Sequence, residues 1–225
     1  MSTVNAVGRR RNTRGEGSIL RGELIEAAAR LLAESERPES LTLRQVAREV
    51  GVAPASIYSH FADLGALIDH VVDLRYAELA ALMTEADRAG TPIERLARHV
   101  ATFVEWGVDH PGEYRTLFSG RVPVGVAAPV HHAGMELLDS MTDALAAAVD
   151  RGHAPVRDPA SAGLLLWTAM HGLVTAYTEH PNVPWPPLSD LVVRLVALHA
   201  DVADIEVQGS ITEMSRWCPA PEIRR

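Results

Sequence analysis

The stretch TLRQVAREVGVAPASIYSHF, residues 42–61, contains two short helical patterns separated by a glycine. Thr42 and Gln45 form a capping-box pattern at the start of the first helix, and a buried stripe is expected behind them at Leu43, Val46, Ala47 and Val50. Gly51 suits the left-handed position that follows a helix, and Pro54 suits the first turn of the next one. The stretch therefore predicts a helix-turn-helix, whose second helix can enter a DNA major groove about 12 Å wide.

The second helix of this motif is expected over residues 54–61, and its two sides differ in character. Ile57 and Phe61 lie four positions apart, so both can face inward. Polar side chains are expected on the exposed side, namely Ser56, Tyr58 and His60. The alternative for Tyr58 is a packing tyrosine with a solvated hydroxyl.

The rest of the chain divides into segments of helical length, because proline, glycine and polar clusters interrupt its apolar periodicity and no segment alternates with period two. Helices are expected over 19–34, from Asp63 toward Ala89, after the break at 90–92, and briefly after 111–112. A loop is expected at 119–129, followed by three longer helices at 131–150, 159–179 and 188–206. The predicted fold class is all-α, with about nine helices.

The order and spacing of residues 42–61 are specific enough to suggest a family. The pairs Val46-Ala47, Gly51-Val52, Ile57-Tyr58 and His60-Phe61, with Leu43 before and Leu67 after them, resemble the N-terminal domain of the tetracycline-repressor (TetR) family over roughly residues 18–70. Two positions depart from the family pattern. Ala53 replaces the usual Ser or Thr at the helix N-cap, which typically costs about 0.5–2 kcal/mol, and Leu64 replaces a Lys that would touch a backbone phosphate. Neither change removes a side chain that is expected to contact base edges.

The resemblance implies a set of DNA contacts. Tyr58 and His60 would hold phosphates, and Thr42 and Arg44 would contact the backbone or bases from the preceding helix. Base edges would lie near Pro54, Ala55 and Ser56, where the apolar groups suit thymine methyls. The stretch before the first expected helix forms an arm that carries Arg9, Arg10, Arg11 and Arg14. This arm can reach a neighbouring minor groove, or it can remain a tail without a defined contact.

The C-terminal part carries a second, shorter resemblance. Residues 167–172, Trp-Thr-Ala-Met-His-Gly, are similar to the Trp-x-x-x-His-Gly signature of the Trp-His-Gly (WHG) subfamily, and residues 110–114 give a looser match. Leu164, Trp167, His171 and Val174 are expected on one helix face, and Gly172 would let a neighbouring helix approach closely. Candidates for lining an apolar ligand cavity, with ordinary core as the alternative for each, are Phe103, Trp106, Tyr114, Phe118, Met135, Trp167, Met170 and His171.

The family architecture implies four parts and an assembly. The parts are an Arg-rich flexible arm (1–17), a three-helix DNA-binding domain (18–64), a helical ligand-binding and dimerisation domain (65–208) and a C-terminal tail (209–225). The last two long helices would pair two subunits, placing recognition helices about 34–36 Å apart on a palindromic operator. A small apolar or aromatic effector would release this repressor from double-stranded DNA. No cofactor is expected.

Charge and composition are compatible with this interpretation. Residues 1–60 hold 9 Arg against 7 acidic residues, whereas residues 61–225 hold 12 Arg against 22 acidic residues, so positive charge is concentrated where DNA would bind. The single cysteine, Cys218, excludes an internal disulfide, and the polar N-terminus has no apolar segment behind it. A cytoplasmic, nucleoid-associated bacterial protein is expected.

Other functional classes are open alternatives. No nucleophile elbow, phosphate loop or His-Glu-x-x-His pattern supports an enzyme, although His131, His132 and Glu136 could be considered as metal ligands. No metal site is predicted. The uncharged stretch 159–178 reaches the length of a membrane span but contains polar residues, which favours a helix buried in protein. A DNA-compacting protein is disfavoured by the net charge of −8.

Overall fold

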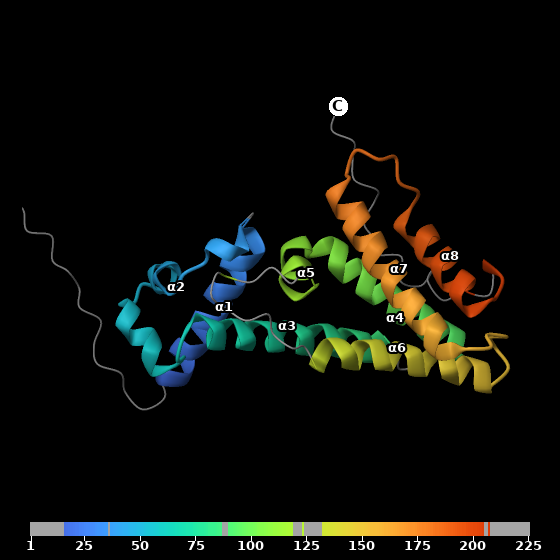
Figure 1. Cartoon of the computed structure of the whole chain (residues 1–225), viewed down its shortest axis with the longest axis horizontal. Coiled ribbons are helices and arrows are strands. Elements are labelled where there is room, and N and C mark those ends of the chain that lie inside the picture. Colours follow the sequence, from blue (N-terminus) through green and yellow to red (C-terminus); the bar gives the residue numbers. More distant parts are fainter. Residues whose placement is uncertain are drawn as a thin grey trace, which may run out of the picture. The chain divides into compact units, whose positions relative to one another are not determined.

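The computed structural model describes residues 16–35, 37–86, 90–118, 123, 132–204 and 207. Within them the fold is all-α, as predicted, with no strand (Figure 1). The elements are α1 (Glu16–Glu34), η1 (Pro38–Ser40), α2 (Leu43–Val50), η2 (Pro54–Ser59), α3 (Leu64–Ala86), α4 (Pro92–Asp109), α5 (Pro111–Phe118), α6 (His132–Asp150), α7 (Pro159–Glu179) and α8 (Leu188–Ala200), where η denotes a 3-10 helix.

Contacts between residues divide the chain into two compact units, and the division falls inside α3, after Val71. Among the described residues, unit 1 contains α1, η1, α2, η2 and the first turns of α3. Unit 2 contains the remainder of α3 together with α4, α5, α6, α7 and α8.

The core of unit 1 is formed where α1, α2 and η2 meet. Leu24 of α1, Val46 of α2 and Ile57 of η2 are each fully buried. Phe61, just after η2, is 3% exposed and lies edge-on to His70, with ring centroids 5.4 Å apart. The guanidinium of Arg21 lies 5.0 Å from the centroid of the Phe61 ring, a cation–π contact that ties α1 to the end of η2.

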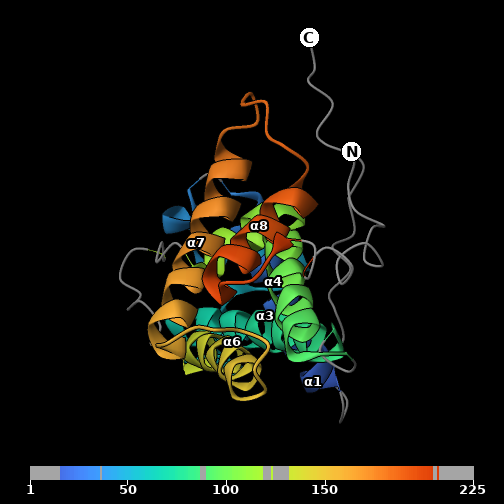
Figure 2. The ribbon, with the colours of Figure 1, turned by 90° about the vertical axis from the view of Figure 1, so that its right-hand side faces the viewer.

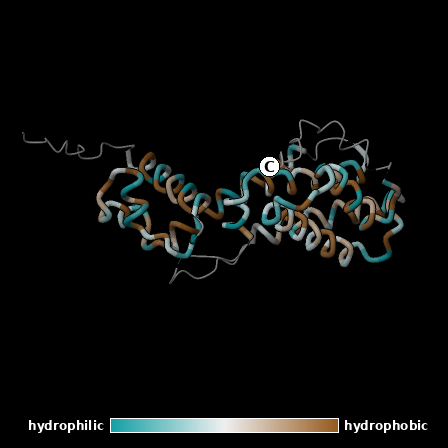
Figure 3. Tube along the Cα trace, turned by 90° about the horizontal axis from the view of Figure 1, so that it is seen from above, coloured by the Kyte–Doolittle hydropathy of each residue, from teal (hydrophilic) through white to brown (hydrophobic). Residues whose placement is uncertain are grey.

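The core of unit 2 is organised around α4, which contacts α5, α6, α7 and α8 (Figure 2). Eleven of its residues are buried, among them Phe103, Val104 and Gly107. Figure 3 shows hydrophilic and hydrophobic residues interspersed along the helices. In the part of the chain that the structure describes, α7 included, no helix is long and apolar enough to cross a membrane.

Local sequence signals explain where the helices of unit 2 begin. Thr91 forms a complete capping box: its Oγ1 accepts from the Glu94 amide at 3.3 Å, and Glu94 Oε2 accepts from the Thr91 amide at 2.6 Å. Asp158 caps α7 by accepting from the Ser161 amide at 3.1 Å. Pro92 and Pro159 follow these caps, in the first turn where the missing amide donor costs nothing.

Some expected boundaries change. The helix expected over 188–206 ends at Ala200, because Asp201 takes a left-handed conformation (φ 54°) and the amides of Asp201 and Val202 both donate to the Ala197 carbonyl. At the start of α3, Asp63 is the cap, since its Oδ1 accepts from the Ala66 amide at 2.8 Å. The expected loop at 119–129, apart from residue 123, and the tail at 209–225 lie outside the described residues.

A close helix approach occurs at Gly107 on α4, and another at Gly163 on α7, where a Cβ would lie 2.7 Å from Thr142 Oγ1. A Cβ built at Gly107 would lie 2.8 Å from Val174 Cγ1 and 2.9 Å from Tyr114 Cδ2. The expectation that Gly172 fills this role is wrong within the chain, because a Cβ at Gly172 meets nothing within 4 Å. Leu164 and Val174, which the sequence predicts on one face of α7, differ in burial: Val174 is fully buried, whereas Leu164 is 54% exposed.

Gly107→Ala is expected to lower the free energy of unfolding by about 1–3 kcal/mol, because the added methyl overlaps two side chains of a packed core. Gly22→Ala is the matched control: it is a helical glycine with open space around its Cβ position, so the change is expected to be neutral or to stabilise by up to about 1 kcal/mol. Urea unfolding followed by circular dichroism measures both. Equal stability of the two variants would contradict the close approach.

Candidate nucleic-acid interface and ligand cavity

The first half of the helix-turn-helix has the predicted ends. Thr42 is the N-cap of α2, and its Oγ1 accepts from the Gln45 amide at 3.3 Å. The predicted return bond differs, because Gln45 Oε1 accepts from the Thr42 hydroxyl at 2.7 Å rather than from the Thr42 backbone amide. Gly51 is left-handed (φ 75°) as predicted, and the Val52 amide donates to the Ala47 carbonyl at 2.9 Å, which closes the turn.

The second half is a 3-10 helix, Pro54–Ser59, rather than an α-helical segment reaching Phe61. Its bonds span three residues: the Ser56 amide donates to the Ala53 carbonyl at 2.9 Å, and the His60 amide donates to Ile57 at 2.8 Å. The Ala53 side chain offers no capping acceptor. With a missing cap and no amide proton on Pro54, the short segment tightens instead of continuing as an α-helix.

The sides of η2 separate as the sequence predicts. Ile57 is fully buried and Phe61 is 3% exposed, whereas Tyr58 is 63% exposed. The Tyr58 side chain is therefore not part of the core. The other residues expected at DNA also reach the surface of unit 1: Thr42, Arg44, Pro54 and Ala55 are exposed, and Ser56 and His60 are half-buried.

The electrostatics of this surface suit an anionic partner. Residues 50–62 contain no acidic side chain, and α2 exposes Arg44 and Arg48 beside them. Glu49 is the acidic residue of α2, and its carboxylate lies 3.4 Å from an Arg30 amino group. The arm residues Arg9, Arg10, Arg11 and Arg14 lie outside the described residues.

Unit 2 contains a cavity of about 590 Å³ between α3, α5, α6 and α7. Five of the eight predicted cavity residues line it: Tyr114, Phe118, Met135, Trp167 and His171. The other three belong to the core. Phe103 and Met170 are fully buried, and Trp106 is 7% exposed and stacks on His110 with ring centroids 5.5 Å apart.

Sequence reasoning missed the remaining lining residues, which are Tyr76, Arg115, Leu117, Gly134, Leu138, Thr175, Thr178 and Glu179. A signal for part of this set exists on α7. Thr175 and Glu179 follow His171 at successive intervals of four residues, which places all three on one helix face. On α6, Gly134, Met135 and Leu138 also recur at three- and four-residue spacing, whereas Tyr76 is the lining residue from α3.

The aromatic side chains at the cavity converge on His171. Its ring centroid lies 4.6 Å from that of Trp167, 4.7 Å from Phe118 and 5.2 Å from Phe103. These three contacts are edge-to-face, which is a favoured geometry for aromatic pairs. We call Phe103, Tyr114, Phe118, Trp167 and His171 the aromatic cluster.

Tyr114 and His171 are joined by a hydrogen bond of 2.5 Å between the hydroxyl and Nδ1. Burial raises the pKa of Tyr114 well above its ordinary value, and a hydrogen bond with Thr175 lowers it in part. Burial lowers the pKa of His171 to about 4. Both side chains are therefore neutral near pH 7.

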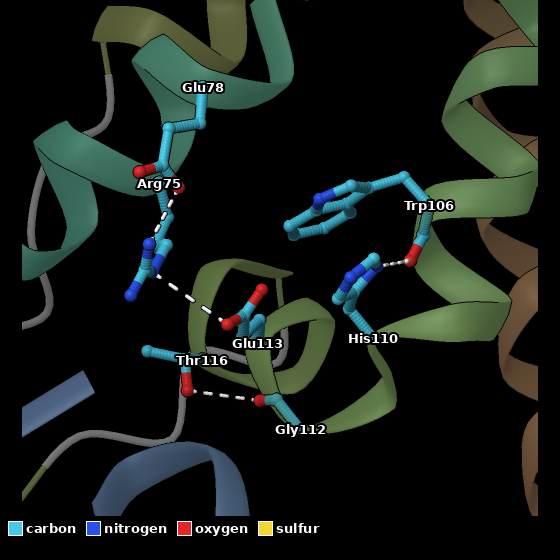
Figure 4. Close-up of polar contacts among 7 residues, drawn as sticks. All are labelled: Arg75, Glu78, Trp106, His110, Gly112, Glu113 and Thr116. Atoms are coloured by element: carbon cyan, nitrogen blue, oxygen red, sulfur yellow. Dashed lines mark hydrogen bonds and ion pairs between the residues drawn. The ribbon is translucent and has the colours of Figure 1, made fainter. Parts of the chain in front are cut away.

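A set of polar contacts holds α5 in place beside the cavity (Figure 4). Arg75 of α3 donates to Glu78 Oε2 at 2.6 Å and lies 3.8 Å from Glu113 Oε1 of α5. Nearby, the Tyr76 hydroxyl donates to the Leu117 carbonyl at 3.3 Å. At the other end of α5, His110 Nδ1 lies 3.0 Å from the Trp106 carbonyl oxygen. The two contacts from α3, to Glu113 and to Leu117, hold α5 and with it Tyr114 at the cavity wall.

The metal alternative raised by the sequence involves His131, His132 and Glu136. Among the described residues there is no group of three His, Cys, Asp or Glu side chains placed to hold a metal ion. His131 and the side chain of His132 lie outside them.

Two family models match the chain in the order of its two units. Residues 24–71 match the model described as bacterial regulatory proteins, tetR family, and residues 93–198 match the tetracyclin repressor-like C-terminal domain. Together these ranges span more than half of the 225 residues. The chain belongs to the TetR family of DNA-binding transcriptional regulators, and it is not an enzyme. The WHG assignment stays a prediction.

Solved structures share this fold. A protein of unknown function from a Rhodococcus species is 24% identical with a TM-score of 0.65, covering 81% of this chain and 92% of that one. The fatty acid degradation regulator FadR from Bacillus halodurans is 14% identical with a TM-score of 0.62, covering 84% and 97%. The TetR-family regulator PfmR from Thermus thermophilus is 18% identical with a TM-score of 0.60, covering 78% and 94%.

The depressed pKa of His171 predicts a pH dependence of stability. The unfolded imidazole takes up a proton near its ordinary pKa of 6.5, whereas the folded one stays neutral down to about 4. The unfolded state therefore binds more protons in this window, and stability falls as the pH falls. Allowing for partial exposure of the ring, we expect a loss of about 2 kcal/mol.

His171→Gln is expected to remove this component while keeping a side chain that can bond to Tyr114. Chemical unfolding of both proteins between about pH 6.5 and 4 should show a smaller fall in stability for the variant, because the carboxylates and the other histidines titrate equally in the two. Parallel stability curves would rule out a neutral His171.

Proposed function

We propose that the protein is a homodimeric repressor, with unit 1 bound to a palindromic operator and a small molecule in the cavity of unit 2 releasing it. The observation that carries the DNA-binding proposal is the division of η2 between buried Ile57 and exposed Tyr58. Family membership and the acid-free stretch 50–62 support the same conclusion. Such a protein would act in the cytoplasm on double-stranded DNA.

The contact roles proposed for the individual residues follow from their positions. Tyr58 and His60 would donate to phosphates, Arg44 would supply a charge, and Thr42 would contact the adjacent backbone. The methyl and methylene groups of Ala55 and Pro54, with the Ser56 hydroxyl, would meet base edges. These residues all reach the surface of unit 1. The arm residues would add affinity that does not depend on sequence.

The outer surfaces of α7 and α8 support the proposed dimer. Leu164 and Leu165 of α7 are 54% and 60% exposed, and Leu198 of α8 is 78% exposed. These helices pack side by side in Figure 2. Exposed leucines on neighbouring helices favour an apolar interface, and a two-fold pairing of this surface would present two copies of η2 to the two half-sites.

Selection of random duplexes by the purified protein tests the whole proposal. We expect enrichment of a palindrome whose half-sites repeat at about one helical turn or a multiple of it. Absence of enrichment over random competitor at modest salt would favour the compaction alternative. A reporter placed behind the selected site should be silenced by the protein, and activation would contradict the repressor assignment.

Tyr58→Phe and Arg44→Gln are expected to weaken operator binding in different ways. Loss of a hydroxyl-to-phosphate bond should cost about tenfold in affinity without changing the salt dependence, because tyrosine is uncharged. Loss of the Arg44 charge should reduce the slope of log affinity against log salt by about one unit. Val183→Ala, an exposed side chain of unit 2, is the control and should leave both quantities unchanged. Salt titrations by fluorescence anisotropy measure them.

Leu198→Glu is expected to convert a dimer to a monomer, because a charge would be buried at the proposed interface. Light scattering coupled to size-exclusion chromatography measures the mass. Leu82→Glu, a 48% exposed leucine on α3, serves as the control and should remain dimeric. A monomeric parent protein, or a Leu198→Glu variant that stays dimeric, would refute pairing through α7 and α8.

A further inference from the structure

We propose that the cavity of unit 2 binds an uncharged aromatic molecule that carries one hydrogen-bonding substituent, with the ring held by Trp167 and Phe118 and the substituent bound at His171. This inference rests on the proposed function, since it names the class of effector for the same cavity. Three observations support the proposal: the size and aromatic wall of the cavity, the balance of charges in its lining, and the hydrogen bond between the neutral side chains of Tyr114 and His171.

The size and wall of the cavity suit a ring system. A volume of about 590 Å³ lies within the usual range for small-molecule sites. Trp167 and Phe118 contribute to the wall with ring centroids 6.2 Å apart and planes at 77°. A flat ligand can lie along one of these rings and meet the edge of the other, which are the two arrangements that aromatic pairs favour.

The charge of the lining favours a neutral ligand. Arg115 and Glu179 are the charged residues among the described lining, and their charges are of opposite sign. The described lining therefore carries no net charge. Near pH 7 the Tyr114–His171 pair adds none, so a carboxylate or ammonium on the ligand would lose its hydration without a counter-ion at this pair.

One face of α7 supplies the polar edge. The hydrogen bond to Tyr114 uses Nδ1 of His171, so Nε2 is the ring atom through which His171 can bond to a ligand. If Tyr114 donates to Nδ1, then Nε2 carries the proton and donates; in the other tautomer Nε2 accepts. A hydroxyl group on the ligand serves both cases. Thr175 and Thr178 continue this edge along the cavity.

Calorimetry with a matched set of probes tests the proposal on the full-length protein. The probes are 1-naphthol, naphthalene, decahydro-1-naphthol and 1-naphthoate. We expect 1-naphthol to bind most tightly. Naphthalene should bind about three- to tenfold more weakly, because it lacks the hydrogen bond. Decahydro-1-naphthol should be weaker by a similar factor, because it lacks the aromatic face, and 1-naphthoate should be weaker by about tenfold or more.

Variants assign the effects to residues. His171→Phe keeps a ring and removes both nitrogens, so it should abolish the preference for 1-naphthol over naphthalene. Trp167→Leu should reduce the preference for 1-naphthol over its saturated analogue. Trp185→Phe is the control, because Trp185 does not line the cavity: its ring packs at a tilt against Tyr177, and its Nε1 donates to the His180 carbonyl. Its affinities should match those of the parent protein. Thermal unfolding of each variant verifies that it folds.

Two outcomes overturn the inference: decahydro-1-naphthol or 1-naphthoate binding as tightly as 1-naphthol, or no binding of 1-naphthol by the folded protein. A His171→Phe variant that keeps the full preference would overturn the role of His171. Duplex selection with the same preparation separates the two proposals. Operator enrichment without 1-naphthol binding would refute the proposed ligand class but not the regulator function. Binding of 1-naphthol without operator enrichment would refute the regulator function but not the ligand class.

Discussion

The contact between α4 and α7 at Gly107 is the constraint on which the rest of unit 2 depends. Because Gly107 has no side chain, Val174 of α7 and Tyr114 of α5 can both occupy the space where a Cβ would be. This approach brings Phe103 of α4 within 5.2 Å of the His171 ring and places Tyr114 within hydrogen-bonding distance of His171. A wider spacing of these two helices would separate the aromatic cluster and open the core, where cavities are costly.

Much of the fold follows from local signals in the sequence. The left-handed Gly51, the Thr42 cap and the inward position of Ile57 were all predictable, because each depends on residues within one turn of it. The 3-10 geometry of η2 was not foreseen, although the missing cap at Ala53 was recognised. The end of α8 at Ala200 depends on a left-handed Asp201, which composition does not reveal.

Which side chains line the cavity could be predicted only in part from the sequence. Residue type identified the aromatic cluster, since large apolar rings and a histidine in one helical domain tend to pack together. Residue type alone could not distinguish Trp106, which stacks on His110 at the end of α4, from Trp167, which lines the cavity. That distinction depends on the rotation of each helix about its axis. The rotation of α4 is set by contacts with α6, α7 and α8, which are distant in sequence.

The tight winding of η2 has a consequence for how DNA sequence would be read. With three residues per turn, side chains three positions apart are eclipsed, so the exposed Ala55 and Tyr58 form one outward ridge, whereas Ile57 is the buried residue of η2. An α-helix would instead fan these groups over a broader arc of the groove. A narrow ridge of one methyl and one phenol ring contains few donors, so operator choice would depend more on thymine positions and groove width than on a dense hydrogen-bond code.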